Sequence, residues 1–289
     1  MGWRERLGSG EFLTVVEALP PKGVDVKGFE EQLIPLKGRV EAIYVPSLQG
    51  GVMRMSAWGA SRYLLDRGYE PLCEISCAHQ NRVAMQAELL GAYHVGIENI
   101  MAVVGDDPKL GDHPEAQAVF DIDLLELLGA IRNLQEGHDM SGGDLEGLPR
   151  FCVGTKVNAS ILGKGLDAEI RGMEEKANLG AEFFVTSSVY DLGQFETFMQ
   201  KARGFGAPVI AGLMVLKSAG MARYINKHLE GVVVPEGIIE RLMKAPDKIL
   251  TSIEIAAEII KELRGMCQGV SIIAMGWEDK VPAILDAAG

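Results

Sequence analysis

The chain has 289 residues and a formal net charge of −12, with 47% hydrophobic and 24% charged residues. This composition is typical of a folded globular protein, and the acidic balance argues against nucleic-acid binding, which needs clustered Lys and Arg. No apolar run reaches the ~20 residues of a membrane helix, and the start, MGWRERLGSGEF, lacks the apolar stretch of a secretory signal. We therefore expect a cytoplasmic protein with no membrane span.

Short apolar runs alternate with segments of helical spacing along the whole chain. The apolar runs predict eight strands, over residues 12–18, 40–46, 70–77, 97–105, 150–157, 181–187, 208–215 and 270–276. Helical spacing predicts helices over residues 26–38, 52–68, 81–96, 121–136, 166–180, 192–206, 217–227, 235–244, 249–266 and 280–288. A polar, Gly-rich insertion at 136–149 separates the fourth unit from the fifth.

Strands that are apolar on both faces and separated by helices require a parallel sheet covered by helices. Eight such units favour closure into an α/β fold of the (β/α)8 TIM barrel type, as a single domain over residues 1–289. The competing architecture is an open doubly wound sheet. The first predicted strand is not followed by the Gly-x-Gly-x-x-Gly turn of a dinucleotide site, which favours the barrel.

Polar residues gather where the predicted strands end. In a barrel these ends converge on one mouth, where reactive groups usually lie. Glu17 closes the first strand, and a carboxylate at an apolar strand end tends to have a raised pKa and can serve as a general acid; a solvated or salt-bridged Glu is the alternative. Other strand ends carry His79, Gly105, Asp106, Thr155, Lys156, Thr186 and Ser187.

The sequence predicts no metal site. Cys73, Cys77 and His79 lie close together, but their spacing is not the Cys-x2-Cys of common zinc sites. The acidic loop 105–113 lacks the alternating pattern and closing Glu of a calcium loop. Four dispersed cysteines do not form a disulfide framework, so we expect reduced thiols. A serine nucleophile elbow and a phosphate loop are also missing from the sequence.

Several stretches together resemble the methylenetetrahydrofolate reductase family, particularly the short form of anaerobic bacteria that make acetyl groups by a C1 pathway. The stretches are Glu17-Ala-Leu-Pro-Pro-Lys22, Asn81-Arg82, Val104-Gly-Asp-Asp-Pro108, Gly111-Asp-His-Pro114, Phe120-Asp121, Lys176-Ala-Asn-Leu-Gly-Ala-Glu-Phe-Phe-Val-Thr186, Leu216-Lys-Ser-Ala219 and Met275-Gly-Trp-Glu278. They follow one another in order over almost the whole chain.

The resemblance implies a barrel that holds FAD or FMN noncovalently and reduces methylenetetrahydrofolate to methyltetrahydrofolate. It assigns Glu17 as the acid that protonates the folate amine, and Asp106 as the residue that contacts the pterin beside the flavin. It places flavin contacts at His79, Gly105, Phe120, Thr155, Lys156 and Lys176. It places substrate contacts at Thr186, Ser187 and Leu213. The short forms also imply a zinc-containing partner subunit or a larger electron-transfer complex, and a homo-oligomer is possible on a barrel exterior.

The chain departs from the family at three places. Ser187 stands where the family commonly has Gln, Val104 where it often has Arg, and residues 45–49 replace a stretch that usually carries polar groups. A buried pterin edge without its amide partner would cost ~1–3 kcal/mol. These departures leave two alternatives open: a pterin-binding methyl-transfer module without flavin chemistry, and a non-catalytic subunit of a C1-pathway complex.

Overall fold

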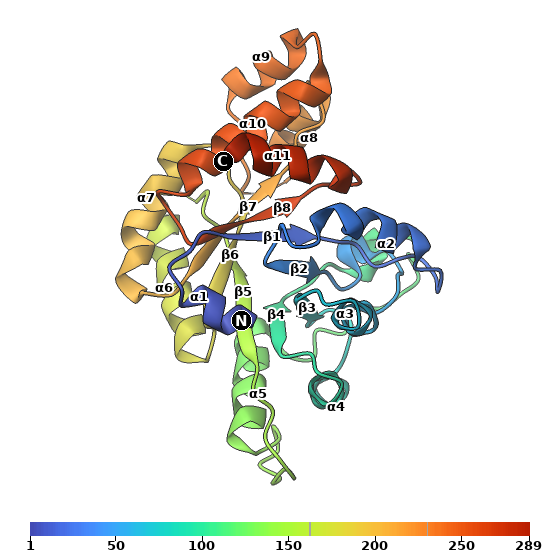
Figure 1. Ribbon diagram of the computed structural model, residues 1–289. Coiled ribbons are helices and arrows are strands. Elements are labelled where there is room, and N and C mark those ends of the chain that lie inside the picture. The colour runs from blue at the N-terminus through green and yellow to red at the C-terminus, as the bar shows by residue number, and fades with distance from the viewer. Residues whose placement is uncertain (162, 230) are drawn as a thin grey trace.

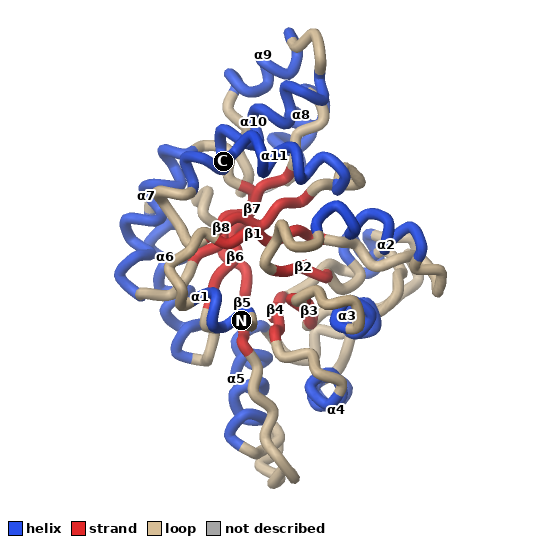
Figure 2. Tube along the Cα trace, in the orientation of Figure 1, coloured by secondary structure: helices blue, strands red, loops and turns tan. Residues whose placement is uncertain are grey.

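The structure is a computed structural model that describes residues 1–161, 163–229 and 231–289. Eight parallel strands form a closed barrel in chain order, and β8 is hydrogen-bonded to β1, which confirms the predicted (β/α)8 fold. Figure 2 shows the strands at the centre and most of the helices around them. The strands are β1 (Leu13–Glu17), β2 (Ala42–Val45), β3 (Pro71–Ser76), β4 (Asn99–Val103), β5 (Cys152–Val157), β6 (Phe183–Ser188), β7 (Val209–Met214) and β8 (Gly269–Ile273).

Helices follow the strands as the periodicity predicts, with an extra pair after β7. They are α2 (Lys27–Leu33), α3 (Ala57–Leu65), α4 (Arg82–His94), α5 (Leu124–Glu136), α6 (Lys164–Asn178), α7 (Leu192–Ala202), α8 (Ala219–His228), α9 (Glu236–Lys244), α10 (Lys248–Leu263) and α11 (Val281–Ala288). In Figure 1, α8 and α9 extend outward from the ring of helices. None of the helices within the described residues has the length and hydropathy needed to cross a membrane.

Two helices differ most from the ranges that their apolar spacing predicts, each for a local reason. Helix α2 ends at Leu33 and passes into a 3-10 turn over Ile34–Leu36, because Pro35 has no N–H for an α-helical hydrogen bond. Helix α3 begins at Ala57 instead of residue 52, because the Ser56 side chain accepts a hydrogen bond from the N–H of Gly59 and caps the helix there.

The polar insertion forms a small hairpin at the end of α5. The helix stops at Gly137, which adopts a left-handed conformation with φ of 95°. His138 and Asp144 then form an antiparallel bridge, and Figure 1 shows this segment extending away from the barrel. The insertion therefore lies outside the barrel mouth.

A short helix that the sequence analysis did not predict, α1 (Trp3–Leu7), packs against the N-terminal ends of the strands. Trp3 is 1% exposed, and its ring meets that of Phe183 edge to face, with centroids 5.4 Å apart. Trp3 and Leu7 belong to the apolar cluster that fills the barrel interior, with Leu13, Val15, Ala42, Tyr44, Leu72, Met101, Cys152, Phe183, Val185 and Ile210. Helix α1 therefore covers one end of the barrel, and the ligand cavity lies at the other.

Candidate active site

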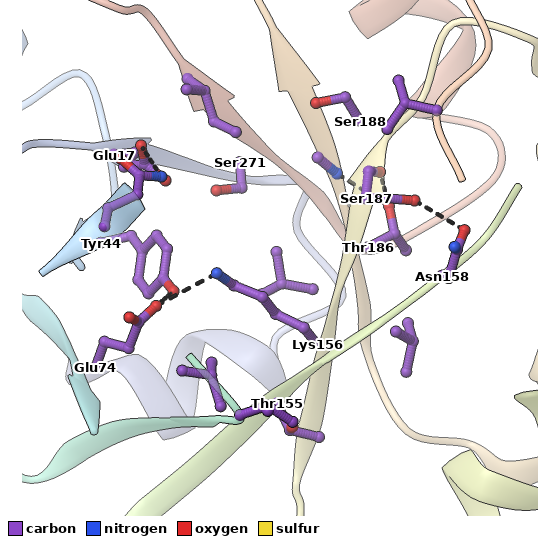
Figure 3. A pocket seen from close by; sticks show the side chains of 18 of the residues that line it. Glu17, Tyr44, Glu74, Thr155, Lys156, Asn158, Thr186, Ser187, Ser188 and Ser271 are labelled. Carbon is purple, nitrogen blue, oxygen red and sulfur yellow. Dashed lines mark hydrogen bonds and ion pairs between the residues drawn. The ribbon is translucent and has the colours of Figure 1, made fainter. Parts of the chain in front are cut away.

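A cavity of about 660 Å³ lies at the C-terminal ends of the strands, within the ~300–1,000 Å³ typical of small-molecule sites. Every strand of the barrel contributes a side chain to its wall, as the fold predicts. The contributing residues are Glu17, Tyr44, Glu74, Val103, Lys156, Ser187, Met214 and Ile273, and Figure 3 shows the polar ones among them.

Glu17 is a buried acid in this cavity, as its position at a strand end predicts. Its residue is 6% exposed, and its carboxylate accepts a hydrogen bond of 3.1 Å from the Gln49 side chain. Burial raises the pKa of Glu17 from 4.5 to about 7, against the opposing charge of Lys156. Near neutral pH a substantial fraction of Glu17 therefore carries a proton that it can donate.

The raised pKa of Glu17 predicts a pH-dependent cost in stability. The folded pKa of about 7 lies above the ordinary value of 4.5, so ionising Glu17 destabilises the fold progressively as the pH rises between these values. The shift corresponds to about 3 kcal/mol at pH 8. We expect Glu17→Gln to match the parent protein in urea unfolding at pH 4.5 and to be more stable at pH 8. The exposed position Glu146 provides the control, since Glu146→Gln should change the stability by no more than about 0.5 kcal/mol. A gain in Glu17→Gln that is independent of pH would contradict the burial of an ionisable Glu17.

A second buried carboxylate, Glu74, is a site residue that the sequence analysis did not single out. It lies in β3 and is 7% exposed. Its carboxylate accepts hydrogen bonds from the Tyr44 hydroxyl, from the Ser47 N–H at 3.1 Å and from the Lys156 ammonium at 3.3 Å (Figure 3). The available signal was a single charge in the middle of the apolar run EPLCEISC, because a charge there needs a buried partner.

Lys156, a predicted flavin contact, lines the cavity, and its ammonium is paired with the Glu74 carboxylate. Lys176, on α6, is the lysine nearer the outer wall, and it donates a hydrogen bond of 3.2 Å to the backbone carbonyl of Lys156. Burial lowers the pKa of Lys176, and a bound anion would offset this by stabilising the ammonium.

The turn after β4 brings Gly105 and Asp106 to the cavity rim, as predicted. Gly105 has φ of 84°, and a Cβ there would lie 1.8 Å from the Ser76 hydroxyl, so a side chain cannot be accommodated. Asp106 lines the cavity but is exposed, and its carboxylate accepts a hydrogen bond of 2.6 Å from the N–H of Gly50. Asp106 thus connects the β4 turn to the loop after β2.

Asp112 joins three of the loops around the mouth. Its carboxylate is paired with the Lys22 ammonium after β1 and accepts a hydrogen bond of 2.9 Å from the N–H of Met53 after β2. The Lys22 ammonium is the largest cause that lowers the pKa of Asp112, so the carboxylate stays charged. The rim beside Glu17 is therefore held by a polar network.

Thr155 and Thr186 line the cavity, but their hydroxyls donate hydrogen bonds to backbone carbonyls. Thr155 donates to the backbone carbonyl of Ala102 at 2.8 Å. Thr186 donates to the carbonyl of Ser187 at 2.7 Å and accepts from the N–H of Gly212 at 3.1 Å. Both threonines thus shape the wall between strands, and their hydroxyl hydrogens are already used in these bonds.

Ser187 also lines the cavity, and it has a carboxamide beside it. The Ser187 hydroxyl donates to the Oδ1 atom of Asn158 at 3.2 Å, which Figure 3 shows across the ends of β5 and β6. Ser187 stands where the family commonly has Gln, and the Asn158 side chain brings an amide to the same part of the wall.

Three predicted contact residues lie outside the cavity wall. Leu213 is buried in the layer between strands and helices, because alternation along β7 turns Gly212 and Met214 inward and Leu213 outward. Phe120 is 45% exposed and has φ of 41°. His79 is half-buried, and neither ring nitrogen has a hydrogen-bond partner among the described residues. Burial lowers the pKa of His79, so the ring is neutral.

The cysteines near this end of the barrel belong to the core. Cys73 and Cys77 are buried in the layer between strands and helices, and burial raises their pKa values to about 12 and about 11. Within the described part of the chain, no group of three or more His, Cys, Asp and Glu side chains is arranged to hold a metal ion.

Comparisons with known proteins agree with this geometry. The family model for methylenetetrahydrofolate reductase matches residues 3–289. Methylenetetrahydrofolate reductase 2 of Schizosaccharomyces pombe is 24% identical over 242 residues, covering 76% of this chain and 36% of that protein. Methylenetetrahydrofolate reductase 2 of Saccharomyces cerevisiae is 23% identical over 207 residues, covering 70% and 32%. The chain therefore spans about a third of the length of these relatives.

A solved protein from Clostridium thermocellum shares the barrel with a TM-score of 0.68 and 13% identity, over 100% of this chain and 98% of that one. That protein is described as uncharacterized and as binding two copies of 5-methyl-5,6,7,8-tetrahydrofolic acid. The family model, in contrast, covers almost every residue of this chain. The protein belongs to the methylenetetrahydrofolate reductase family.

Proposed function

We propose that this protein is a flavin-dependent reductase that converts methylenetetrahydrofolate, or a related methylene-pterin, to the methyl form. The observation that carries the proposal is the buried Glu17 carboxyl, with a pKa raised to about 7, inside a cavity of ligand size. Opening a methylene bridge between two amines requires a proton at one nitrogen, and a carboxylic acid with a pKa near 7 is suited to donate it.

The folate substrate is supported from two directions. The relatives named as methylenetetrahydrofolate reductases align with 70% or more of this chain, and the Clostridium thermocellum protein with the same fold binds a methylated folate. In this chain, Asn158 and Ser187 offer an amide and a hydroxyl that could pair with the polar edge of a pterin. Asp106 lies across the rim, where its carboxylate could accept from ligand N–H groups.

The residues of the cavity also fit a flavin. A flat ring system can pack against the apolar side chains of the wall. They are Leu124, Val157, Val185, Met214, Leu229 and Val232. Lys176 would hold a phosphate group, and the Gly105 turn lets the ligand approach the backbone. The ring nitrogens of His79 have no hydrogen-bond partner among the described residues and could serve a ligand near this turn. A bound flavin would supply the hydride, which no side chain can provide.

The chain's own residues supply the proton of the reaction and balance the charge that remains. Gln49 donates a hydrogen bond to the Glu17 carboxyl, and burial in the wall raises its pKa to about 7, so part of the acid is protonated near neutral pH. Glu17 gives its proton to the amine nitrogen as the C–N bond of the methylene bridge breaks, which leaves an iminium carbon able to accept a hydride. The carboxylate that remains is balanced by Lys156 until it regains a proton from solvent.

The visible absorption spectrum of the purified protein tests this proposal. The protein should show flavin bands, either as purified or after addition of FAD or FMN. These bands should bleach with a reductant and recover when methylenetetrahydrofolate is added. A colourless protein that rejects both flavins would contradict the reductase. If such a protein still binds methyltetrahydrofolate, the methyl-transfer alternative takes its place.

A further inference from the structure

Tyr44, Glu74 and Lys156 form a cluster in which the Glu74 carboxylate holds the Lys156 ammonium in place. Three donors from three places in the chain converge on the Glu74 carboxylate: the Tyr44 hydroxyl, the Ser47 N–H and the Lys156 ammonium. The ammonium also lies 5.2 Å from the centroid of the Tyr44 ring. Figure 3 shows the Lys156 side chain crossing the floor of the cavity toward this pair.

The two charges of the pair differ in their access to the cavity. The Glu74 side chain is 5% exposed, whereas the Lys156 side chain is 48% exposed. An ammonium has three N–H donors, and Glu74 uses one of them, so Lys156 keeps donors that face the cavity. Burial alone would lower the pKa of Lys156, but the carboxylates of Glu74 and Glu17 outweigh it and raise it. Lys156 is therefore a permanently charged group whose position depends on Glu74.

Glu17 lies within the field of this pair. The groups that act on it come from four other elements: Lys156 of β5, Glu74 of β3, Gln49 of η2 (Gln49–Gly51) and Glu278 of η5 (Glu278–Lys280). Lys156 is the cation among them, and it acts more strongly on Glu17 than Glu74 does. Tyr44, which holds Glu74, is paired with Glu17 in the register of β1 and β2.

We propose that the ion pair of Glu74 and Lys156, which shares the cavity wall with Glu17, sets how tightly the catalytic acid keeps its proton: the Lys156 ammonium favours the carboxylate form of Glu17, and the Glu74 carboxylate opposes that effect. The inference rests on the proposed function only in naming Glu17 as the acid. It gives Glu74 a role that does not require contact with the substrate. It also predicts that the two members of the pair have opposite effects, because one is a cation near Glu17 and the other is the anion that partly cancels it.

Titration of Glu17 in the ligand-free protein tests this inference directly. With 13C-labelled glutamate, the Glu17 carboxyl resonance can be identified by its disappearance in Glu17→Gln. Lys156→Met should raise the pH at which Glu17 titrates by about one unit, a tenfold change in proton affinity, and Glu74→Gln should lower it by a smaller amount. Lys156→Arg, which keeps the charge, should remain close to the parent. Lys176→Met is the matched control, and it should leave the titration unchanged.

If Lys156→Met and Glu74→Gln both shift the titration of Glu17 in the same direction, the inference is overturned. A general loosening of the site would change the pKa of Glu17 in the same direction in both variants. The absence of any shift would overturn it too. If Lys156→Met does not fold, Glu74→Gln and the double variant Glu74→Gln/Lys156→Met carry the test, and Glu17 should titrate at a higher pH in the double variant than in Glu74→Gln. Since the titration uses neither flavin nor folate, a protein that fails the reductase assay can still support this inference, and an active reductase can still contradict it.

Discussion

Glu17→Gln is expected to reduce the rate of methylenetetrahydrofolate reduction by a factor of ~10² or more while flavin binding is retained. Glutamine fills the same volume and can still pair with Gln49, but it has no acidic proton to give to the folate amine. The measurement is reoxidation of reduced flavin by methylenetetrahydrofolate in a single turnover, with flavin content determined from the absorption spectrum.

Glu41→Gln is the matched control for this variant. Glu41 is a half-buried glutamate that accepts a hydrogen bond of 2.7 Å from the N–H of Thr14, at the end of the barrel opposite the cavity. We expect Glu41→Gln to turn over at the parent rate. Unchanged turnover in Glu17→Gln would remove Glu17 from the mechanism, whereas loss of flavin in that variant would indicate a binding role.

Trp3→Ala is expected to lower the free energy of unfolding by ~3–5 kcal/mol, the usual loss when a large aromatic side chain is removed from a core. Trp3 is 1% exposed and packs edge to face on Phe183 at the covered end of the barrel. Urea denaturation followed by circular dichroism measures the loss. The end of the barrel that α1 covers should also become more accessible to solvent. Faster amide hydrogen exchange in β6 would show this.

Two variants calibrate the Trp3 result. The indole N–H of Trp3 has no hydrogen-bond partner in the part of the chain that the structure describes, so Trp3→Phe keeps the ring contact without losing a bond and should cost clearly less. Trp58 is 44% exposed on α3, and Trp58→Ala should stay within about 0.5 kcal/mol of the parent. A loss below about 1 kcal/mol in Trp3→Ala would show that α1 is not part of the stable core.

The barrel itself could be predicted because its signals are local. Alternating apolar runs and helical spacing recur along the chain, and each unit carries its own pattern. The positions of Glu17, Gly105 and Asp106 follow from the same reasoning, since parallel strands in a closed barrel bring all their C-terminal ends to one mouth. Helix α1 was missed because five residues are too few for periodicity, and it gains stability only by packing on the open end of the barrel.

The orientation of side chains around the barrel was harder to predict. Period-two alternation tells which residues of a strand share a face, but it does not identify the inner face of an entirely buried strand. The family resemblance placed Leu213 at the substrate although it faces the helices, and Glu74 was overlooked although it faces inward. The pairing across strands, with its register and its bulge between β6 and β7, settles these orientations.

The sequence alone determined the order of the elements, the closed barrel, the family and the acid at the end of the first strand. The tertiary structure decided which charges meet: Glu74 pairs with Lys156, 82 positions further along the chain, and Ser187 with Asn158 from the neighbouring strand. The physical reason is that secondary structure depends on the periodicity of neighbours. The proton affinity of a buried group depends instead on burial and on charges that only folding brings together.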